Sequence, residues 1–165
     1  MKVEIEWMDP IDLKGKNHNS GGYDEEFLKN IEPVPGVYVF TRKYGQKFTP
    51  IYIGKSKDLR RRLKIQMNNL KLMEQLRNGH PKNSNSLSAI NGKRVLFVGY
   101  SRTASAANKD KAIELAEKGL IEFAMSNGFP IVNIHGTIVK YHEIIASGAG
   151  ETKGFMPDRI LVRIR

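Results

Sequence analysis

One acidic residue, Glu117, falls where a helix is expected to be apolar. Successive residues of a helix lie about 100° apart, and with Ile113 at zero Glu117 falls at about 40°, inside the stripe of Ile113, Leu120 and Ala124. A carboxylate that faces a core is costly unless a cation or a metal ion compensates it. Glu117 is therefore a candidate metal ligand. The alternative is a carboxylate at the edge of the stripe, in contact with water or paired with a structural arginine.

A second candidate lies in a run of three arginines, Arg60, Arg61 and Arg62. On a helical wheel counted from Leu59, Arg62 borders the apolar stripe, whereas Arg60 and Arg61 point elsewhere. The planar guanidinium of Arg62 could therefore bind a phosphate at a site near the core. The alternative is a solvated basic face in which one arginine pairs with an acid.

Two tyrosines and a lysine complete the set. Tyr38 and Tyr52 lie in β-rich segments, and Gly54 and Lys55 follow Tyr52 closely. A glycine in a strand permits close approach of another group. Each tyrosine alone is more commonly a packing residue. Together, the hydroxyls, cations and one carboxylate suit phosphodiester hydrolysis, in which a carboxylate holds a hard divalent cation and cations neutralise the phosphate.

These residues lie in a pattern that resembles the GIY-YIG nuclease family. The pattern spans about 60% of the chain and consists of Gly36-Val37-Tyr38, Tyr52-Ile53-Gly54 with the basic run to Leu63, Glu117-Lys118-Gly119-Leu120-Ile121-Glu122, and Pro130-Ile131-Val132-Asn133. The first triplet has valine where the family has isoleucine. The resemblance implies a small α/β domain with a three-stranded antiparallel sheet, and metal-dependent hydrolysis of DNA.

The resemblance also implies a role for each site residue. Glu117 would be the metal ligand for Mg²⁺ or Mn²⁺, and Arg62 would contact the scissile phosphate. Tyr38 would orient or deprotonate the attacking water, assisted by Tyr52 and Lys55. The family's later asparagine falls on Asn133. Some members carry a histidine in the region of the first helix, and His80 lies just past that helix here.

The elements that must position these residues follow from hydrophobic periodicity and turn residues. Strands are predicted at 1–7, 36–40, 50–54, 94–100, 131–134, 137–145 and 159–165. Helices are predicted at 24–31, 58–78 (capped by Ser56 or Asp58) and 109–126, with a further short helix at 86–90. Residues 8–22 and 79–92 are expected to be loops, 41–49 a long basic loop, and 147–150 a hinge.

This order predicts a small α/β domain, with a central antiparallel or mixed sheet flanked by helices and extended by N- and C-terminal strands. We expect an N-terminal arm at 1–35, a nuclease-like domain at 36–135 and a C-terminal extension at 136–165, which together form one compact domain overall.

The charge distribution points to a polyanionic partner. The chain has 27 basic and 17 acidic residues, yet residues 1–35 are acidic overall and the ten residues from Lys55 to Lys64 contain six basic residues and one acidic residue. Such a basic face is typical of DNA binding. The candidate DNA contacts are Arg42, Lys43, Lys55, Lys57, Arg60, Arg61 and Lys64.

The amino-acid composition excludes several classes of protein and site. The absence of cysteine excludes disulfides, thiolate metal sites and a cysteine nucleophile, and no apolar run is long enough for a membrane helix. We expect a cytoplasmic DNA endonuclease, either restriction-like or of a repair or recombination type. Its specificity would come from its terminal segments, a homodimer or a protein partner. The alternative is a non-catalytic nucleic-acid-binding module that uses the same basic face.

Overall fold

The computed structural model describes residues 2–15, 23–78, 93–102, 108–129, 131–132, 140–145 and 159–164. It contains two compact units, 1–132 and 133–165. In the second unit, β6 (Lys140–Ile145) and β7 (Arg159–Ile164) form an antiparallel pair. None of the helices in these ranges combines the length and apolar character needed to cross a membrane.

The first unit is built on an antiparallel sheet. Its strand order is β1-β5-β3-β4, formed by β1 (Ile5–Trp7), β5 (Lys93–Ser101), β3 (Gly36–Tyr44) and β4 (Lys47–Ser56). A further strand, β2 (Ile11–Leu13), also pairs with β5. The predicted fold class, an α/β domain with an antiparallel sheet flanked by helices, is confirmed. The segment that we separated as an N-terminal arm supplies β1 and β2 to this sheet.

Two loop predictions were wrong. Residues 11–13 form β2, because their backbone pairs with β5 at a distance in sequence that local patterns do not reveal. Residues 41–49 are not a long loop: β3 and β4 continue to a tight turn at Gly45, whose φ of 57° suits glycine. The cross-strand contact of the Lys43 ammonium with the Phe48 ring, at 5.2 Å from the centroid, accompanies this extension.

The predicted helix over 58–78 is two helices, α2 (Leu59–Met67) and α3 (Leu70–Asn78). Asp58 caps α2, and its carboxylate accepts a hydrogen bond from the Arg61 backbone N–H. The break lies at Asn68 and Asn69. The Asn69 side chain accepts from the Leu72 N–H at 3.1 Å and so begins α3. As a result Leu70, whose spacing from Leu59, Leu63 and Met67 would place it in the apolar stripe of one continuous helix, is 82% exposed.

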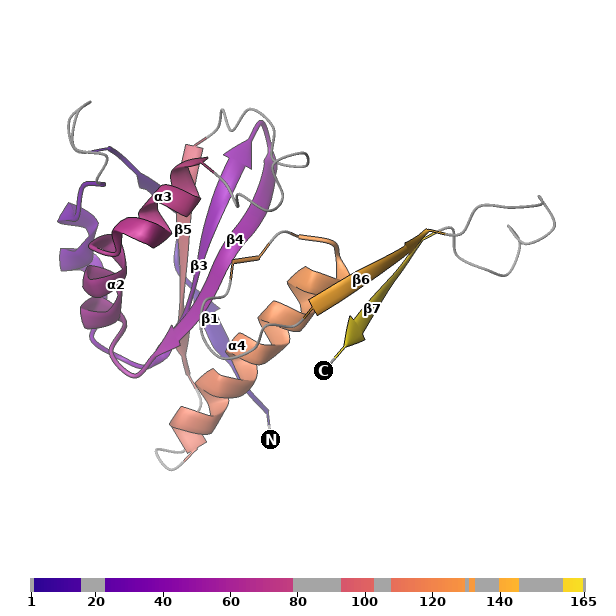
Figure 1. Ribbon diagram of the computed structural model, residues 1–165. Helices are drawn as coiled ribbons and strands as arrows, with labels where there is room; N and C mark the ends of the chain where they lie inside the picture. Colours follow the sequence, from indigo (N-terminus) through magenta and orange to yellow (C-terminus); the bar gives the residue numbers. More distant parts are fainter. Residues whose placement is uncertain are drawn as a thin grey trace. The chain divides into compact units, whose positions relative to one another are not determined.

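Helices cover both faces of the sheet (Figure 1). On one face α2, α3 and the 3₁₀ helix η1 (Glu26–Asn30) pack over a core that includes Tyr38, Phe40 and Tyr52. On the other face α4 (Lys109–Ser126) packs its Leu120, Ile121 and Ala124 against three strand residues, namely Val39, Ile53 and Phe97. Because β4 ends the strand order, its residues lie at an edge between the two helical layers.

The remaining expectations have mixed outcomes. The bounds of α4 agree with prediction, whereas the strand expected over 1–7 is shortened to β1. Residues 131–132 are not in a strand, although the Val132 N–H donates to the Ile51 carbonyl at 2.6 Å. The predicted short helix at 86–90 and hinge at 147–150 lie outside the described residues.

Candidate active site

The hydroxyl of Tyr38 marks the centre of the candidate site. Tyr38 lies on β3 opposite Gly54 of β4, and its side chain is fully buried. A Cβ atom on Gly54 would lie 2.4 Å from both Cζ and Oη of Tyr38. The glycine therefore allows the Tyr38 ring to extend over the edge strand. The ring of Tyr52 stacks against it, with centroids 6.0 Å apart and an interplanar angle of 26°.

Helix α2 brings two polar side chains to this hydroxyl. Arg62 Nε donates to Tyr38 Oη at 3.3 Å. Gln66, one turn further along, accepts through its amide oxygen from the Tyr38 hydroxyl at 3.1 Å and from Arg62 Nε and Nη2 at 3.2 Å. This amide orientation gives every group a partner, because the opposite one would set the Gln66 nitrogen against the guanidinium donors.

Gln66 is a site residue that our sequence reasoning missed. It is buried beside Leu63 and Met67 on the inner face of α2. The wheel argument that singled out Glu117 would have found it, since a buried polar side chain needs a partner.

The surroundings of Tyr38 and Arg62 shift the pKa values of both side chains. Burial raises the pKa of Tyr38 far above its usual value, the neighbouring Tyr52 adds to this, and the hydrogen bond from Arg62 only partly opposes it. Burial has the largest single influence and would lower the pKa of Arg62, but the hydrogen bond to Tyr38 and the electrostatic influence of Tyr38 and Tyr52 together outweigh it, so the pKa is raised. At neutral pH the site therefore contains a neutral phenol beside a guanidinium cation.

An ion pair lies on the other side of the edge strand. Lys55 Nζ is 3.2 Å from Glu117 Oε2, and their side chains are 35% and 24% exposed. Lys55 directly follows Gly54, and side chains alternate along a strand, so Lys55 faces α4 while Gly54 faces Tyr38. The partner of Glu117 is thus a lysine from another element, and the carboxylate lies at the edge of the core with access to water.

The donor set constrains how a divalent cation could be held. Among the described residues, no group of three or more His, Asp or Glu side chains could form a metal cage. A single carboxylate suits Mg²⁺, which keeps several waters and is commonly held by one or two carboxylates together with substrate phosphates. Glu117 fits such a site, since a carboxylate has lone pairs for more than its contact with Lys55. His80 and Asn133 lie outside the described residues.

Most of the basic residues that we predicted to contact DNA are at the surface. Arg61 and Lys64 are exposed on α2, and Lys57 forms a 2.5 Å ion pair with Asp110. Arg60 is exposed too, but its Nε donates to the Ile31 carbonyl at 2.6 Å, which fixes its direction. Lys43 lies over Phe48, near the turn between β3 and β4.

Arg42 does not belong with these surface residues. It is only 7% exposed, and its Nε and Nη2 donate to the Leu76 carbonyl at 3.1 and 2.9 Å. Burial, and the neighbouring Arg94, lower its pKa to about 10. Strand alternation turns Arg42 toward α3, where it helps to satisfy the helix C-terminus. We therefore remove Arg42 from the proposed DNA face.

Replacing Gly54 with alanine tests the geometry around Tyr38. The new methyl group would overlap the Tyr38 hydroxyl, so the ring must move. We expect a stability loss of about 1–3 kcal/mol from overpacking and, for the DNA cleavage that the sequence predicts, a fall of about 10²-fold from misplacement. The matched control is Gly119→Ala on α4, where a Cβ meets nothing within 4 Å. Thermal unfolding and single-turnover cleavage would measure both, and equal behaviour of the two variants would contradict this geometry.

Comparisons with known proteins give one short similarity. The chain is 44% identical over 48 residues to UvrABC system protein C of Nitrosococcus oceani. This match covers 29% of the present chain and 8% of that protein. No family model matches the chain, and no solved structure matches it.

Proposed function

We propose that the first unit is a DNA endonuclease of the GIY-YIG type, which hydrolyses phosphodiester bonds with Mg²⁺ or Mn²⁺. The observation that carries this proposal is that two consecutive residues of the edge strand β4 lie beside the candidate groups: Gly54 is against Tyr38, which contacts Arg62, and Lys55 pairs with Glu117 on the other face. The order of the motifs in the sequence and the local similarity to UvrABC system protein C support the same assignment.

Each residue has a task in the proposed reaction. Arg62 binds the phosphate that is attacked, and Gln66 and Tyr38 fix the direction of its guanidinium. Glu117 holds the divalent cation, which when bound neutralises charge on the phosphate and activates water. Lys55 adds a second positive charge beside the carboxylate. Tyr52 holds the Tyr38 ring in place by stacking.

The raised pKa of Tyr38 favours an orienting role over a role as a base. A phenol with an ordinary pKa of about 10 is ionised to only about one part in a thousand at pH 7. A higher pKa makes the phenolate scarcer still at any given pH. We infer that Tyr38 acts as a neutral hydroxyl, which accepts from Arg62, donates to Gln66 and so orients the guanidinium that binds the phosphate.

The pH dependence of Tyr38→Phe tests this inference. The variant is expected to lose about 10²-fold in cleavage rate, and the ratio of wild-type to variant rates should stay constant between pH 7 and 9. If the phenolate were the base, that ratio would rise about tenfold for each pH unit, because the ionised fraction rises by that factor below the pKa. Single-turnover rates at five pH values distinguish the two results.

DNA binding is expected to depend strongly on salt. The six cations between Lys55 and Lys64, of which four are exposed and two half-buried, can make about six phosphate contacts, which corresponds to a log–log slope of about −5 on duplex DNA. Fluorescence anisotropy between 50 and about 300 mM salt, with EDTA present to prevent cleavage, measures the slope. A slope near zero would contradict binding through this face.

The direct test of the proposed activity is the nature of the product. End-labelled duplex DNA, incubated with the protein and Mg²⁺, should give shorter strands whose new ends carry one phosphate and one hydroxyl per break. DNA that is bound but stays intact with Mg²⁺ or Mn²⁺ would instead indicate a binding module.

A further inference from the structure

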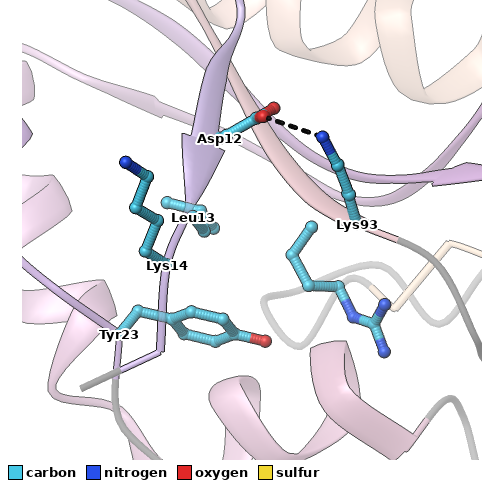
Figure 2. Close-up of a pocket in the computed structure, with 6 residues that line it drawn as sticks. Asp12, Leu13, Lys14, Tyr23 and Lys93 are labelled. Atoms are coloured by element: carbon cyan, nitrogen blue, oxygen red, sulfur yellow. Dashed lines mark ion pairs between the residues drawn. The ribbon is translucent and has the colours of Figure 1, made fainter. Parts of the chain in front are cut away.

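A second group of basic residues lies in the first unit, at the edge of the sheet opposite β4. The group lines a recess of about 390 Å³ between the end of β2 and the start of β5, shown in Figure 2. Six residues line it, namely Asp12, Leu13, Lys14, Tyr23, Lys93 and Arg94. Its volume lies in the range typical of pockets for small ligands.

Backbone pairing builds this recess from three separate segments. Leu13 of β2 pairs with Arg94 of β5 and shares its face of the sheet, whereas the adjacent Lys14 and Lys93 alternate to the other face at the ends of these strands. An isolated bridge between Gly15 and Tyr23, and a 2.7 Å bond from the Asp24 N–H to the Lys14 carbonyl, bring Tyr23 beside β2. In Figure 2 the Tyr23 hydroxyl points across the recess.

The lining carries a surplus of positive charge. Lys14, Lys93 and Arg94 contribute three cations, and Asp12, which pairs with Lys93 at 3.6 Å, contributes one carboxylate. Arg42 lies directly behind, because it is the cross-strand neighbour of Arg94. Both arginines are less than 9% exposed. Such a concentration of cations, with buried guanidinium groups at its base, attracts an anion.

The buried arginines are held in place by α3. Arg94 Nε donates to the Leu76 carbonyl at 2.5 Å, and Arg42 donates to the same oxygen. This contact anchors both guanidinium groups to the C-terminal turn of α3, where the helix dipole favours cations. Tyr23 lies close enough to raise the pKa of both arginines, against a larger lowering by burial. The floor of the recess is therefore rigid, whereas Lys14 is exposed at its rim.

We propose that this recess binds a phosphate group of the DNA substrate, as a second contact distinct from the scissile phosphate. Lys14 and Lys93 reach the phosphate oxygens around the ends of β2 and β5, Arg94 adds positive charge from the other face of the sheet, and the Tyr23 ring packs against the attached nucleoside. This assignment rests on the proposed nuclease function for its choice of DNA as the source. A free nucleoside monophosphate offers the same chemistry and is the other possible source.

The spacing of the two sites suits a contact along one duplex. In the sheet register Tyr38 lies opposite Val98, and Arg42 lies opposite Arg94, four residues further along β3. The two sites are about 17 Å apart, because four residues separate them along the strands and two strand spacings, from β4 to β5, separate them across the sheet. At about 3.4 Å per base pair, the second contact would fall about five base pairs from the cut.

The test uses paired variants of the whole chain. Lys14→Gln with Lys93→Gln removes two positive charges from the rim and leaves the buried Arg94 in place. The control, Lys2→Gln with Lys29→Gln, makes the same charge change at two exposed lysines that each pair with a glutamate. Affinity for a 30-base-pair duplex in EDTA is measured by anisotropy over a range of salt, and binding of deoxyadenosine monophosphate by calorimetry.

We expect the recess variant to bind the duplex about tenfold more weakly at 0.1 M salt, with a salt slope smaller by about one to two. The control should stay within about twofold of wild type by the same reasoning. Equal affinity and slope in the recess variant and the control would overturn the second contact, even if the wild type cuts DNA.

Two further outcomes separate this proposal from the proposed nuclease function. Wild-type protein that binds the monophosphate through Lys14 and Lys93, but does not bind DNA, would overturn the DNA assignment in favour of a free nucleotide. In the other outcome, wild-type protein binds DNA but never cuts it, and the recess variant binds DNA more weakly as expected. That result supports the second contact and contradicts the proposed nuclease function.

Discussion

Glu117→Gln is expected to abolish DNA cleavage while the protein stays folded and binds DNA. The substitution keeps the shape of the side chain but removes the charge that would hold the divalent cation, so the single-turnover rate should fall by about 10³-fold or more. DNA affinity should persist or increase, because a negative charge near the phosphate is removed.

The ion pair between Glu117 and Lys55 determines how much the Glu117→Gln substitution should change the free energy of unfolding. Both side chains are partly exposed, and pairs of this kind contribute only about 0–1 kcal/mol. A buried partner of an arginine would instead cost about 3–5 kcal/mol when removed. The melting temperature of Glu117→Gln should therefore stay close to that of wild type, and any loss of activity would not be due to unfolding.

The matched control is Glu114→Gln, an exposed glutamate on the same helix. It makes the same charge change about one turn away and should leave cleavage unchanged. Melting temperature, DNA affinity and cleavage are measured on one preparation of each variant. A Glu117→Gln protein that cuts at the wild-type rate with Mg²⁺ would refute the role of Glu117.

Arg62→Ala is expected to have the second-largest effect, a loss of about 10²–10³-fold in single-turnover cleavage. Its guanidinium is held by Gln66 and Tyr38, so it can bind the phosphate without reorganising. Arg61→Ala, in the neighbouring position, removes an exposed cation and should weaken binding only a few-fold.

Measuring cleavage with the protein in saturating excess over DNA separates weaker binding from a slower cleavage step. Under that condition weaker binding no longer limits the rate, so Arg61→Ala should recover wild-type cleavage and Arg62→Ala should not. Arg62→Lys keeps the charge but lacks the planar fork, and should remain strongly impaired. Similar small effects of Arg61→Ala and Arg62→Ala at saturation would contradict the assignment of Arg62 to the phosphate.

The sequence predicts much of this fold because its central elements have strong local signals. The strands around Tyr38 and Tyr52 are rich in β-branched and aromatic residues, and α4 ends at Ser126 as predicted, just before Asn127 and Gly128. β2 escapes prediction because three residues carry too little periodicity and their pairing with β5 is a tertiary contact. The break at Asn68 and Asn69 escapes because the apolar spacing continues across it.

The site is less predictable than the fold, because its contacts join separate elements. Helical periodicity identifies Glu117 as unusual, but the wheel cannot show that its partner is Lys55 on a strand. Arg42 shows the opposite error: its charge suggests the surface, whereas strand alternation turns it inward against the end of α3. Net charge therefore indicates a nucleic-acid partner without showing which cations reach it.

The measurement that most directly tests the central claim is the conversion of supercoiled plasmid by purified protein, with Mg²⁺, with EDTA, and with Mg²⁺ restored in excess over EDTA. A metal-dependent endonuclease should produce nicked or linear plasmid with Mg²⁺, none with EDTA, and cleavage again when Mg²⁺ is restored. The Glu117→Gln protein should leave the plasmid supercoiled in all three conditions. Plasmid that wild-type protein binds but leaves supercoiled with Mg²⁺ and with Mn²⁺, or cleavage that continues in EDTA, would contradict the account.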